Sequence, residues 1–323
     1  MTSPKASEGA PRAAQQCADA VLMVRPAAFG FNPDTAASNA FQKAPATNAP
    51  DPQAAALAEF AQLAAGLSAE GIEVCIAEDS RTPAKPDAVF PNNWVSFHAC
   101  GTLVTYPLAN LSRRPERREA VIEAAVRQLN FQVKHLLDLS WYEGEGKHLE
   151  GTGSLVLDHV NRIAYACRSV RTHPQLVQEW CRELKFEPVL FDASDASGAP
   201  FYHTNVCLWI GQQVAMVAAE AIAAPDRERV LQHLAASGRE VILMSRAEVA
   251  AFAGNMLELG TWDEALGDAR VLVMSASARA ALSPRVLAQL SACTDTVLAV
   301  PVPTIEACGG GSVRCMLAEV FRG

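Results

Sequence analysis

The chain has 323 residues, of which 50% are hydrophobic and 19% are charged, so it can bury a substantial core without disulfide or metal support. Its formal net charge of -8 and isoelectric point near 5.4 argue against nucleic-acid or anionic-membrane partners, because phosphate contacts need a basic surface. The composition therefore predicts a globular protein whose partner is a small molecule.

The nine cysteines lie at irregular spacings and form no CxxC pair, which is typical of reduced thiols in the cytoplasm. The N-terminal stretch lacks the apolar core of a signal peptide, and no later segment is apolar enough for a membrane span. We therefore expect a cytoplasmic protein without membrane contacts, with a disordered tail over residues 1–18 and a single catalytic domain over residues 19–323.

Short apolar strands recur along the chain after polar corners. The predicted strands start with VLMVRP at residue 21 and continue with WVSFHA at 94, SLVLDH at 154, VCLWIG at 206, MLEL at 256 and VRCMLAEVF at 313. From the second strand onward the starts lie roughly 50 to 60 residues apart, a spacing typical of repeated supersecondary units.

Each predicted unit runs strand, turn, strand, helix, strand. In the first unit, Gly101 turns VSFHA into TLVTYP, and Ser112 caps the helix ERREAVIEAAVRQL before the strand FQVKHLLDL. The next two units repeat this order, and the fourth is less regular. If VLMVRP completes the last unit, the sequence contains five ββαβ units. Periodicity alone fits a doubly wound sheet as well, and that architecture is more common.

The polar corners favour a closed ring of units over an open sheet. Residues of chemically useful types precede the leading strands, namely Asn93, Glu150, His203 with Asn205, Asn255 and Cys315. If rotation about one axis relates the units, equivalent corners converge on that axis. Residues far apart in the sequence would then share one pocket.

The glycine run GGGSVRC places a cysteine at a sharp corner. Glycines tolerate positive φ and close backbone approach, so Cys315 could be presented as a nucleophile. The alternative is a buried core cysteine, which is how we interpret Cys308 before the glycines. The run lacks the Lys and Ser/Thr of a phosphate loop, and Cys308, Cys315 and His203 have no fourth ligand at a zinc spacing. We therefore expect no metal and no cofactor.

Six short segments together resemble the guanidino-group-modifying superfamily of amidinotransferases, arginine and agmatine deiminases and dimethylarginine hydrolases. They are PDAVFPNN (86–93), LEGTG (149–153), SVRT (169–172), HTN (203–205), GN (254–255) and GGGSVRC (309–315), in the order of that superfamily. The segment VRPAAFGFNPDTAASNAFQ is most similar to its citrulline-hydrolysing branch. The resemblance implies a five-bladed α/β propeller, the pentein fold, with one central active site and no metal.

Two positions depart from the arginine-handling pattern. Where the deiminases carry one aspartate after the phenylalanine motif and another two residues after the histidine, this chain has Asn93 and Asn205. A guanidinium is cationic and suits carboxylates, whereas a ureido group is neutral, with an acceptor oxygen and donor nitrogens that suit carboxamides. The two asparagines therefore favour citrulline over arginine.

The resemblance also implies roles for the corner residues. Cys315 would be the nucleophile, His203 the general acid and base, and Glu150 the acceptor that orients the ureido nitrogens or His203. Asn93 and Asn205 would complete the substrate cradle.

Further substrate contacts are expected from four residues, with Asp87 holding the α-amino group, Arg171 the carboxylate, and Asn255 and Arg314 lining the same pocket. Arg314 is also a candidate cation beside the thiolate. A turn aspartate and a surface ion pair are the alternatives for Asp87 and Arg171. The other candidate histidines are His98, His148 and His173, and residues 29–42 form either a lid or a surface loop.

The sequence thus predicts a cysteine-dependent hydrolase that converts citrulline into ornithine, ammonia and carbon dioxide through a covalent thiol intermediate. Alternatives within this class are arginine deiminase-like, dimethylarginine hydrolase-like and amidinotransferase activities. An alternative of another class is a non-catalytic amino-acid binding protein. The exact substrate, its stereochemistry and the oligomeric state stay open, with a homodimer among the options.

Overall fold

The computed structural model describes residues 15–46, 50–263 and 267–322 and has a mixed α/β fold. Its strands are β1 (Ala20–Arg25), β2 (Glu73–Glu78), β3 (Val95–Phe97), β4 (Thr102–Thr105), β5 (His135–Asp138), β6 (Val156–Asp158), β7 (Ile163–Cys167), β8 (Glu187–Phe191), β9 (Leu208–Ile210), β10 (Val214–Val217), β11 (Glu240–Leu243), β12 (Leu257–Asp263), β13 (Gly267–Ser275), β14 (Thr296–Val300) and β15 (Ala318–Val320).

These strands pair in sets of three that share one topology. In each set the first strand is antiparallel to the second, and the second is parallel to the third. Over the described part of the chain the sets are β15–β1–β2, β3–β4–β5, β6–β7–β8, β9–β10–β11 and β12–β13–β14. β15 also pairs with β3, which joins the first two sets into one six-stranded sheet.

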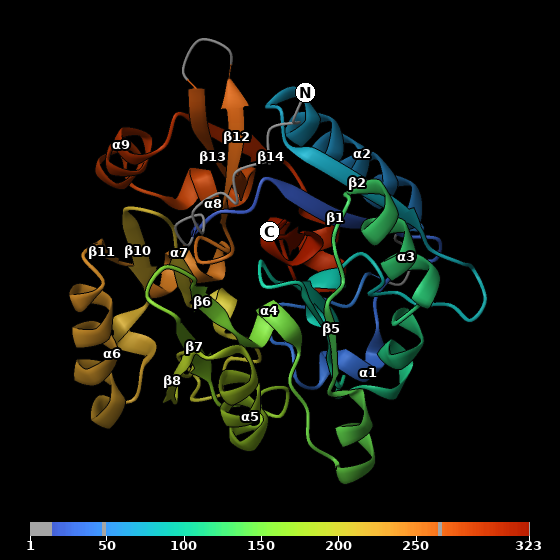
Figure 1. The fold of residues 1–323 in the computed structure, drawn as a ribbon, viewed down its shortest axis with the longest axis horizontal. Coiled ribbons are helices and arrows are strands. Elements are labelled where there is room, and N and C mark those ends of the chain that lie inside the picture. Colours follow the sequence, from blue (N-terminus) through green and yellow to red (C-terminus); the bar gives the residue numbers. More distant parts are fainter. Residues whose placement is uncertain (1–14, 47–49, 264–266, 323) are drawn as a thin grey trace, which may run out of the picture.

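A helix connects the second and third strands of every set. These five helices are α2 (Gln53–Ala69), α3 (Glu119–Gln128), α5 (Pro174–Leu184), α6 (Ala224–Ala236) and α9 (Pro284–Cys293). They lie around the outside of the view in Figure 1. The predicted ββαβ order is therefore confirmed. The shorter helices are α1 (Pro33–Ala36), α4 (Gly151–Ser154), α7 (Arg246–Ala250) and α8 (Ala276–Ala281).

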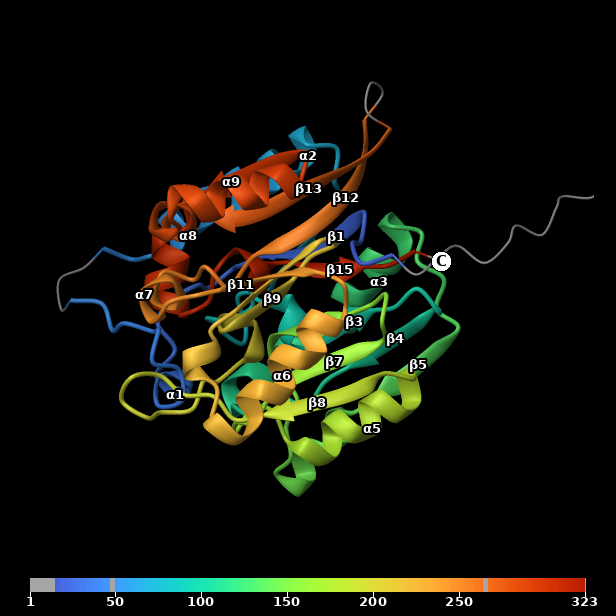
Figure 2. The same cartoon turned by 90° about the vertical axis from the view of Figure 1, so that its left-hand side faces the viewer.

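The strand predicted at residue 21 does complete the last unit. β1 runs antiparallel to β15, with Ala20 opposite Val320 (Figure 2). The side chains of Ala20, Leu22 and Val320 are all fully buried, so this junction is part of the core.

Helix α5 shows why these segments form peripheral helices. Pro174 occupies the first turn, where its missing N–H costs nothing, and Lys185 ends the helix in the left-handed conformation. The apolar side chains repeat on one face, which packs inward, and they are Leu176, Val177, Trp180, Cys181 and Leu184.

The predicted helix start at Ser112 is wrong. Residues Leu111–Glu116 form a 3-10 turn instead, and α3 begins only at Glu119. In a 3-10 turn, side chains three residues apart lie directly above one another, which brings Arg113 and Glu116 together as a buried ion pair. This turn places Arg113 in the functional site.

The predicted tail over residues 1–18 is too long. Gln16 and Ala18 are buried, and Gln16 Nε2 donates to the Leu157 carbonyl at 2.9 Å. Residues 1–14 of that predicted tail lie outside the described residues.

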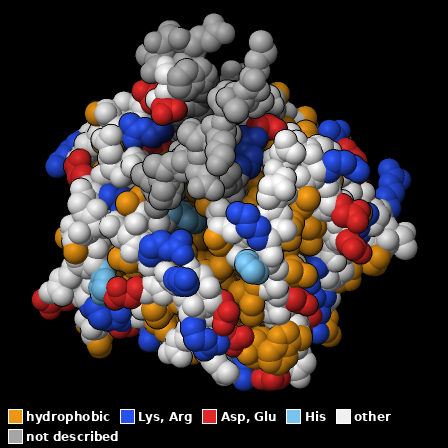
Figure 3. Space-filling model, in the orientation of Figure 1, with side chains coloured by type: hydrophobic (Ala, Val, Ile, Leu, Met, Phe, Trp, Pro, Cys, Tyr) orange, Lys and Arg blue, Asp and Glu red, His pale blue; other side chains and the backbone are white. Residues whose placement is uncertain are grey.

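Two global features bear on the predicted partners. Across the described residues, no helix has both the length and the apolar character needed to cross a bilayer. On the face shown in Figure 3, acidic and basic side chains are interspersed rather than gathered by sign.

Candidate active site

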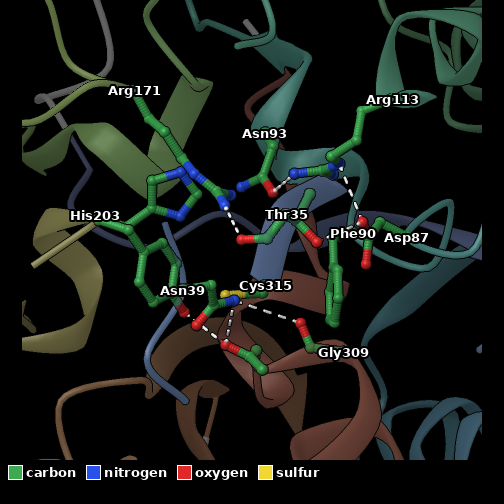
Figure 4. Close-up of a pocket in the computed structure, with 13 residues that line it drawn as sticks. Thr35, Asn39, Asp87, Phe90, Asn93, Arg113, Arg171, His203, Gly309 and Cys315 are labelled. Atoms are coloured by element: carbon green, nitrogen blue, oxygen red, sulfur yellow. Dashed lines mark hydrogen bonds and ion pairs between the residues drawn. The ribbon is translucent and has the colours of Figure 1, made fainter. Parts of the chain in front are cut away.

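Five of the predicted site residues line one cavity (Figure 4). They are Asp87, Asn93, Arg171, His203 and Cys315. Asn93, His203 and Cys315 come from corners that directly precede β3, β9 and β15, so the predicted convergence of corners is confirmed for these residues. The rest of the lining consists of Thr35, Asn39, Phe90, Arg113, Tyr202, Gly309, Gly310 and Gly311.

The glycine run brings Cys315 to the cavity wall. Cys315 lies in the 3-10 turn Val313–Met316 and is 2% exposed. Gly310 has a φ of 64°, a conformation that favours glycine. A Cβ at Gly309 would lie 2.8 Å from the Phe90 ring, so the absence of side chains lets that ring pack against the corner. Cys308 lies outside this lining, and burial raises the pKa of its thiol.

His203 and Glu150 form a buried pair in which Nε2 lies 2.8 Å from Oε2. Burial would raise the pKa of Glu150, but Arg171, His203 and Arg113 hold it well below its usual range. The ionised carboxylate only accepts hydrogen bonds, so it keeps the ring proton on Nε2.

The other ring nitrogen of His203 is therefore an unprotonated acceptor. Burial lowers the pKa of His203 to about 4, against the opposing effect of Glu150, so the ring is neutral at pH 7. Among the described residues, Nδ1 is buried and has no hydrogen-bond partner. A neutral histidine with a free Nδ1 can take a proton from a thiol or a water molecule.

The glycines of the LEGTG segment make close packing around this pair possible. Gly151 has a φ of 48°, and a Cβ there would lie 2.1 Å from the Asn92 carbonyl oxygen. A Cβ at Gly153 would lie 2.6 Å from His203 Nδ1 and 2.7 Å from Asn93 Nδ2. Any larger residue at either position would separate the histidine from the asparagine corner.

Arg113 is a site residue that the sequence analysis missed. Its Nε and Nη2 donate to both carboxylate oxygens of Glu116, at 2.9 and 2.8 Å, and Nη1 donates to Asn93 Oδ1 at 2.9 Å. Nη1 also lies 3.5 Å from Glu150 Oε2. Burial raises the pKa of Glu116 to about 7, although the adjacent Arg113 opposes this shift. The available signal was a basic residue three positions before a glutamate, between the predicted cap Ser112 and the predicted helix.

Arg171 connects the Glu150 corner to the segment at residues 29–42. Its Nη1 lies 3.3 Å from Glu150 Oε2, while Nη2 donates to the Thr35 carbonyl at 3.3 Å and to Ser38 Oγ at 2.8 Å. The guanidinium carbon lies 5.1 Å from the centre of the Tyr202 ring. Nε of Arg171 has no partner among the described residues.

Asp87 has one free carboxylate oxygen at the cavity. Oδ2 accepts from Asn32 Nδ2 at 2.7 Å and lies 3.8 Å from Arg113 Nε. Oδ1 is buried and lacks a partner within the described chain. Burial raises the pKa of Asp87, and the opposing effects of Arg113 and Asn32 are smaller.

The segment at residues 29–42 contributes to the wall of the cavity. Thr35, at α1, and Asn39 both line the cavity. Asn39 Nδ2 donates to the Gly310 carbonyl at 3.2 Å, and Gln42 Nε2 donates to the Cys308 carbonyl at 2.9 Å. The segment therefore spans the cavity between Arg171 and the glycine run.

Three predicted substrate contacts lie outside the cavity lining. Arg314 turns away from the cavity, pairs with Glu319 at 2.6 Å and donates to the Leu317 carbonyl at 2.9 Å. Neighbouring residues of the turn point in different directions, so adjacency to Cys315 does not bring Arg314 to the cavity. Asn255 is also outside the lining, and its Nδ2 lies 3.3 Å from Cys315 Sγ. Asn205 also lies outside the lining, and its Nδ2 lies 3.6 Å from the same sulfur.

The alternative histidines belong to other parts of the fold. His98 Nε2 contacts Ser96 Oγ at 2.8 Å, and burial lowers its pKa to about 3. His148 contacts the Val170 carbonyl, and His173 accepts from Gln175 at the start of α5. In the described ranges, no group of three or more His, Cys, Asp or Glu side chains is placed to hold a metal.

The sequence and the fold identify a member of the pentein superfamily, the guanidino-modifying enzymes, and relate it to the hydrolytic ones. More narrowly, the chain belongs to the family described as N,N dimethylarginine dimethylhydrolase, eukaryotic, whose sequence model matches residues 25–322. No curated protein matches the sequence.

Several solved structures share the fold. Apo ArgZ, an arginine dihydrolase from the ornithine-ammonia cycle in cyanobacteria, is 17% identical with a TM-score of 0.72, over 94% of this chain and 41% of its own. A cysteine-to-alanine variant of AgrE with L-arginine is 16% identical with a TM-score of 0.73, over 94% and 40%.

A third structure is a histidine-to-glycine variant of dimethylarginine dimethylaminohydrolase, as an adduct with S-methyl-L-thiocitrulline. It is 15% identical with a TM-score of 0.64, over 94% of this chain and 99% of its own. Our chain thus spans about two fifths of ArgZ and AgrE. At these identities the structural similarity establishes the fold alone.

Proposed function

We propose that this protein hydrolyses citrulline to ornithine, ammonia and carbon dioxide, with Cys315 as the nucleophile. The observation that carries the proposal is the orientation of two carboxamides. Arg113 offers only donors, so Asn93 turns Oδ1 towards it. Asn93 Nδ2 donates one N–H to Asn92 Oδ1 at 2.9 Å, which leaves its second N–H for the cavity that Asn93 lines. The Thr152 carbonyl only accepts, so Asn205 turns Nδ2 towards it at 3.3 Å and leaves Oδ1 without a partner among the described residues.

A donor and an acceptor together match a ureido group, which has an acceptor oxygen and donor nitrogens. A guanidinium has donors only, so one of its N–H groups would face the N–H of Asn93. The nearby carboxylate of Glu150 already contacts Arg113, Arg171 and His203. A cationic substrate group beside Glu150 would therefore share a carboxylate that already has three partners, and burying a charge without full pairing is costly.

The amino-acid end of the substrate has its own partners. The free Oδ1 of Asp87 can accept from an α-ammonium, and the free Nε of Arg171 can donate to an α-carboxylate. Both side chains line the cavity. They support the binding of a free amino acid rather than of a neutral urea.

The reaction can be written with the residues at hand. The Cys315 thiol gives its proton to His203 Nδ1, and Sγ attacks the ureido carbon. The adduct expels the ornithine amine, which takes the proton from His203, and a carbamoyl group stays on sulfur. Water then loses a proton to His203 and attacks the carbamoyl carbon, which releases the thiol and carbamic acid. Carbamic acid breaks down into ammonia and carbon dioxide.

We also propose that the five strand sets close into a five-bladed α/β propeller around this site, as one domain over residues 19–323. The shared topology of the sets, the peripheral helices and the meeting of three corners at one cavity support this arrangement. The irregular cysteine spacing supports a cytoplasmic location. Residues 29–42 act in this scheme as a lid that opens for the substrate.

A second candidate is hydrolysis of a guanidino substrate, arginine or dimethylarginine. The family match to dimethylarginine hydrolases and the similarity to arginine dihydrolases favour it. Purified protein is incubated separately with citrulline, arginine and dimethylarginine, and ornithine, citrulline and ammonia are measured, with Cys315→Ser as the control. Ornithine from citrulline is expected. Turnover of a guanidino substrate without turnover of citrulline would overturn the ureido assignment.

A further inference from the structure

We infer that Asn255 is a catalytic residue that holds the Cys315 thiolate, assisted by Asn205, through neutral carboxamide donors. Asn255 Nδ2 lies 3.3 Å from Cys315 Sγ, and Asn205 Nδ2 lies 3.6 Å from it. All three side chains are at most 2% exposed, so water does not compete for these contacts. The inference rests on the proposed function in taking Cys315 as the nucleophile.

The direction of the Asn255 amide is fixed by its second contact. Nδ2 also donates to the Asn205 carbonyl oxygen at 3.2 Å, and a carbonyl can only accept. One N–H of Asn255 therefore faces that carbonyl and leaves the other for the sulfur. The two asparagines are linked, because the residue that receives this bond is the second donor to Cys315.

The corner that presents Asn255 adopts an unfavourable backbone conformation. Phe252 has a φ of 62°, which is rare for a bulky residue, and its carbonyl accepts from the Asn255 N–H at 2.8 Å. A Cβ at Gly254 would lie 2.3 Å from the Val206 carbonyl oxygen, so only glycine allows this approach. Such conformations are kept where the placement of a side chain matters. At this corner, the backbone conformation places the side chain of Asn255, which is the donor to Cys315 Sγ.

The donors also replace a cation that the sequence suggested. Arg314 pairs with Glu319 and faces away, so it supplies no positive charge to the thiolate. Burial lowers the pKa of His203 to about 4, so that ring is neutral at pH 7 until it takes the thiol proton. Within the described residues, the hydrogen bonds to Cys315 Sγ come from Asn205 and Asn255. Oriented neutral dipoles in a buried site can stabilise a developing charge without reorganisation.

The test is the alkylation rate of Cys315 by iodoacetamide, followed by peptide mass spectrometry between about pH 5 and pH 10, because the thiolate is the reactive form. The chains compared are the native protein, Asn255→Asp and Asn255→Ser. Asn130→Asp, at an exposed position, is the matched control. Labelling of Cys308 in the same samples reports on general unfolding.

At pH 7 we expect alkylation of Cys315 to be at least about tenfold slower in both Asn255 variants, because a charge-assisted hydrogen bond is lost. With citrulline, kcat should fall while KM stays within about threefold. If Asn255→Asp does not fold, the alkylation rate of Cys315 in the neutral and smaller Asn255→Ser variant tests the same inference.

Unchanged alkylation in a folded Asn255 variant would overturn the inference. Because alkylation needs no substrate, it is independent of the ureido assignment. The native protein could fail to hydrolyse citrulline while Asn255→Ser still slows the alkylation of Cys315. That result would support the role of Asn255 at the thiolate and would contradict the proposed function.

Discussion

Arg113 Nη1 donates to Asn93 Oδ1 at 2.9 Å, and this contact decides which end of the Asn93 amide meets the substrate. Replacing Asn93 by Asp would present a carboxylate to the ureido oxygen. We expect kcat/KM for citrulline to fall about 100-fold or more, since a donor is lost and like partial charges meet. Steady-state ornithine production measures this. Asn130→Asp makes the same chemical change at an exposed position and should leave kcat/KM unchanged.

The contact between His203 and Glu150 predicts a loss of kcat when Glu150 is replaced. Glu150→Gln removes the charge that keeps the proton on Nε2, and its amide can present N–H to the ring instead. We expect kcat to fall by about 10² to 10⁴, the usual contribution of general acid–base catalysis. Glu145→Gln, in the exposed turn before this corner, serves as the control. Retention of more than half of the native kcat by Glu150→Gln would remove His203 and Glu150 from the mechanism.

The Arg314 pair with Glu319 predicts a stability effect rather than a binding effect. Arg314→Met leaves the Glu319 carboxylate, whose side chain is 10% exposed, without its partner, which typically costs about 3–5 kcal/mol for a buried pair. The free energy of unfolding in urea should fall accordingly, while KM for citrulline stays near the native value. The double variant with Glu319→Leu should regain part of the loss. A tenfold rise in KM in folded Arg314→Met would restore a substrate role for Arg314.

The contacts of residues 29–42 predict protection by substrate. Thr35 and Asn39 line the cavity, so a bound amino acid would add contacts to this segment. In Cys315→Ser, which can bind but not react, we expect citrulline to slow amide hydrogen exchange over residues 29–42. Peptides from the peripheral helix α6 should not change. Equal exchange in 29–42 with saturating citrulline would argue for a plain surface loop.

Buried histidines predict a loss of stability in acid. Burial lowers the pKa of His98 to about 3, whereas in the unfolded chain its pKa is near the ordinary histidine value of 6.5. Between these values the unfolded chain binds the extra proton, so stability falls as pH decreases from 6.5 towards 3. From pH 7 to pH 5 this group alone should remove about 2 kcal/mol from the free energy of unfolding. In His98→Gln the pH dependence should be weaker by that amount, as measured by urea unfolding at both pH values.

The sequence predicted the repeat and much of the site because both depend on local patterns. The ββαβ order follows from alternating apolar strands and amphipathic helices, and the HTN and GGGSVRC corners mark His203 and Cys315. The strand at residue 21 could be assigned to the last unit because that unit lacked a partner strand.

The errors arise where a side chain direction depends on distant packing. Arg113 was missed because its 3-10 turn forms around a buried pair with Glu116, which a helical pattern hides. Arg314 was placed beside the substrate because it precedes Cys315, although the turn points it towards Glu319. The contact of Asn255 with sulfur joins two corners far apart in the chain, so residue type alone suggested a substrate contact.

The pairing of β1 with β15 makes folding of the region around Cys315 depend on a contact between distant parts of the chain. Four strand sets are built from neighbouring segments, but this one needs Ala20 to meet Val320, a slow step in folding because it closes a very long loop. Cys315 lies just before β15, so this closure fixes the strand that follows the nucleophile. A circular permutant, linked across β15 and β1 and opened in the exposed loop at residues 196–200, would turn the long closure into a hairpin. The strand that follows its nucleophile would then gain its partner through a local contact, early in folding.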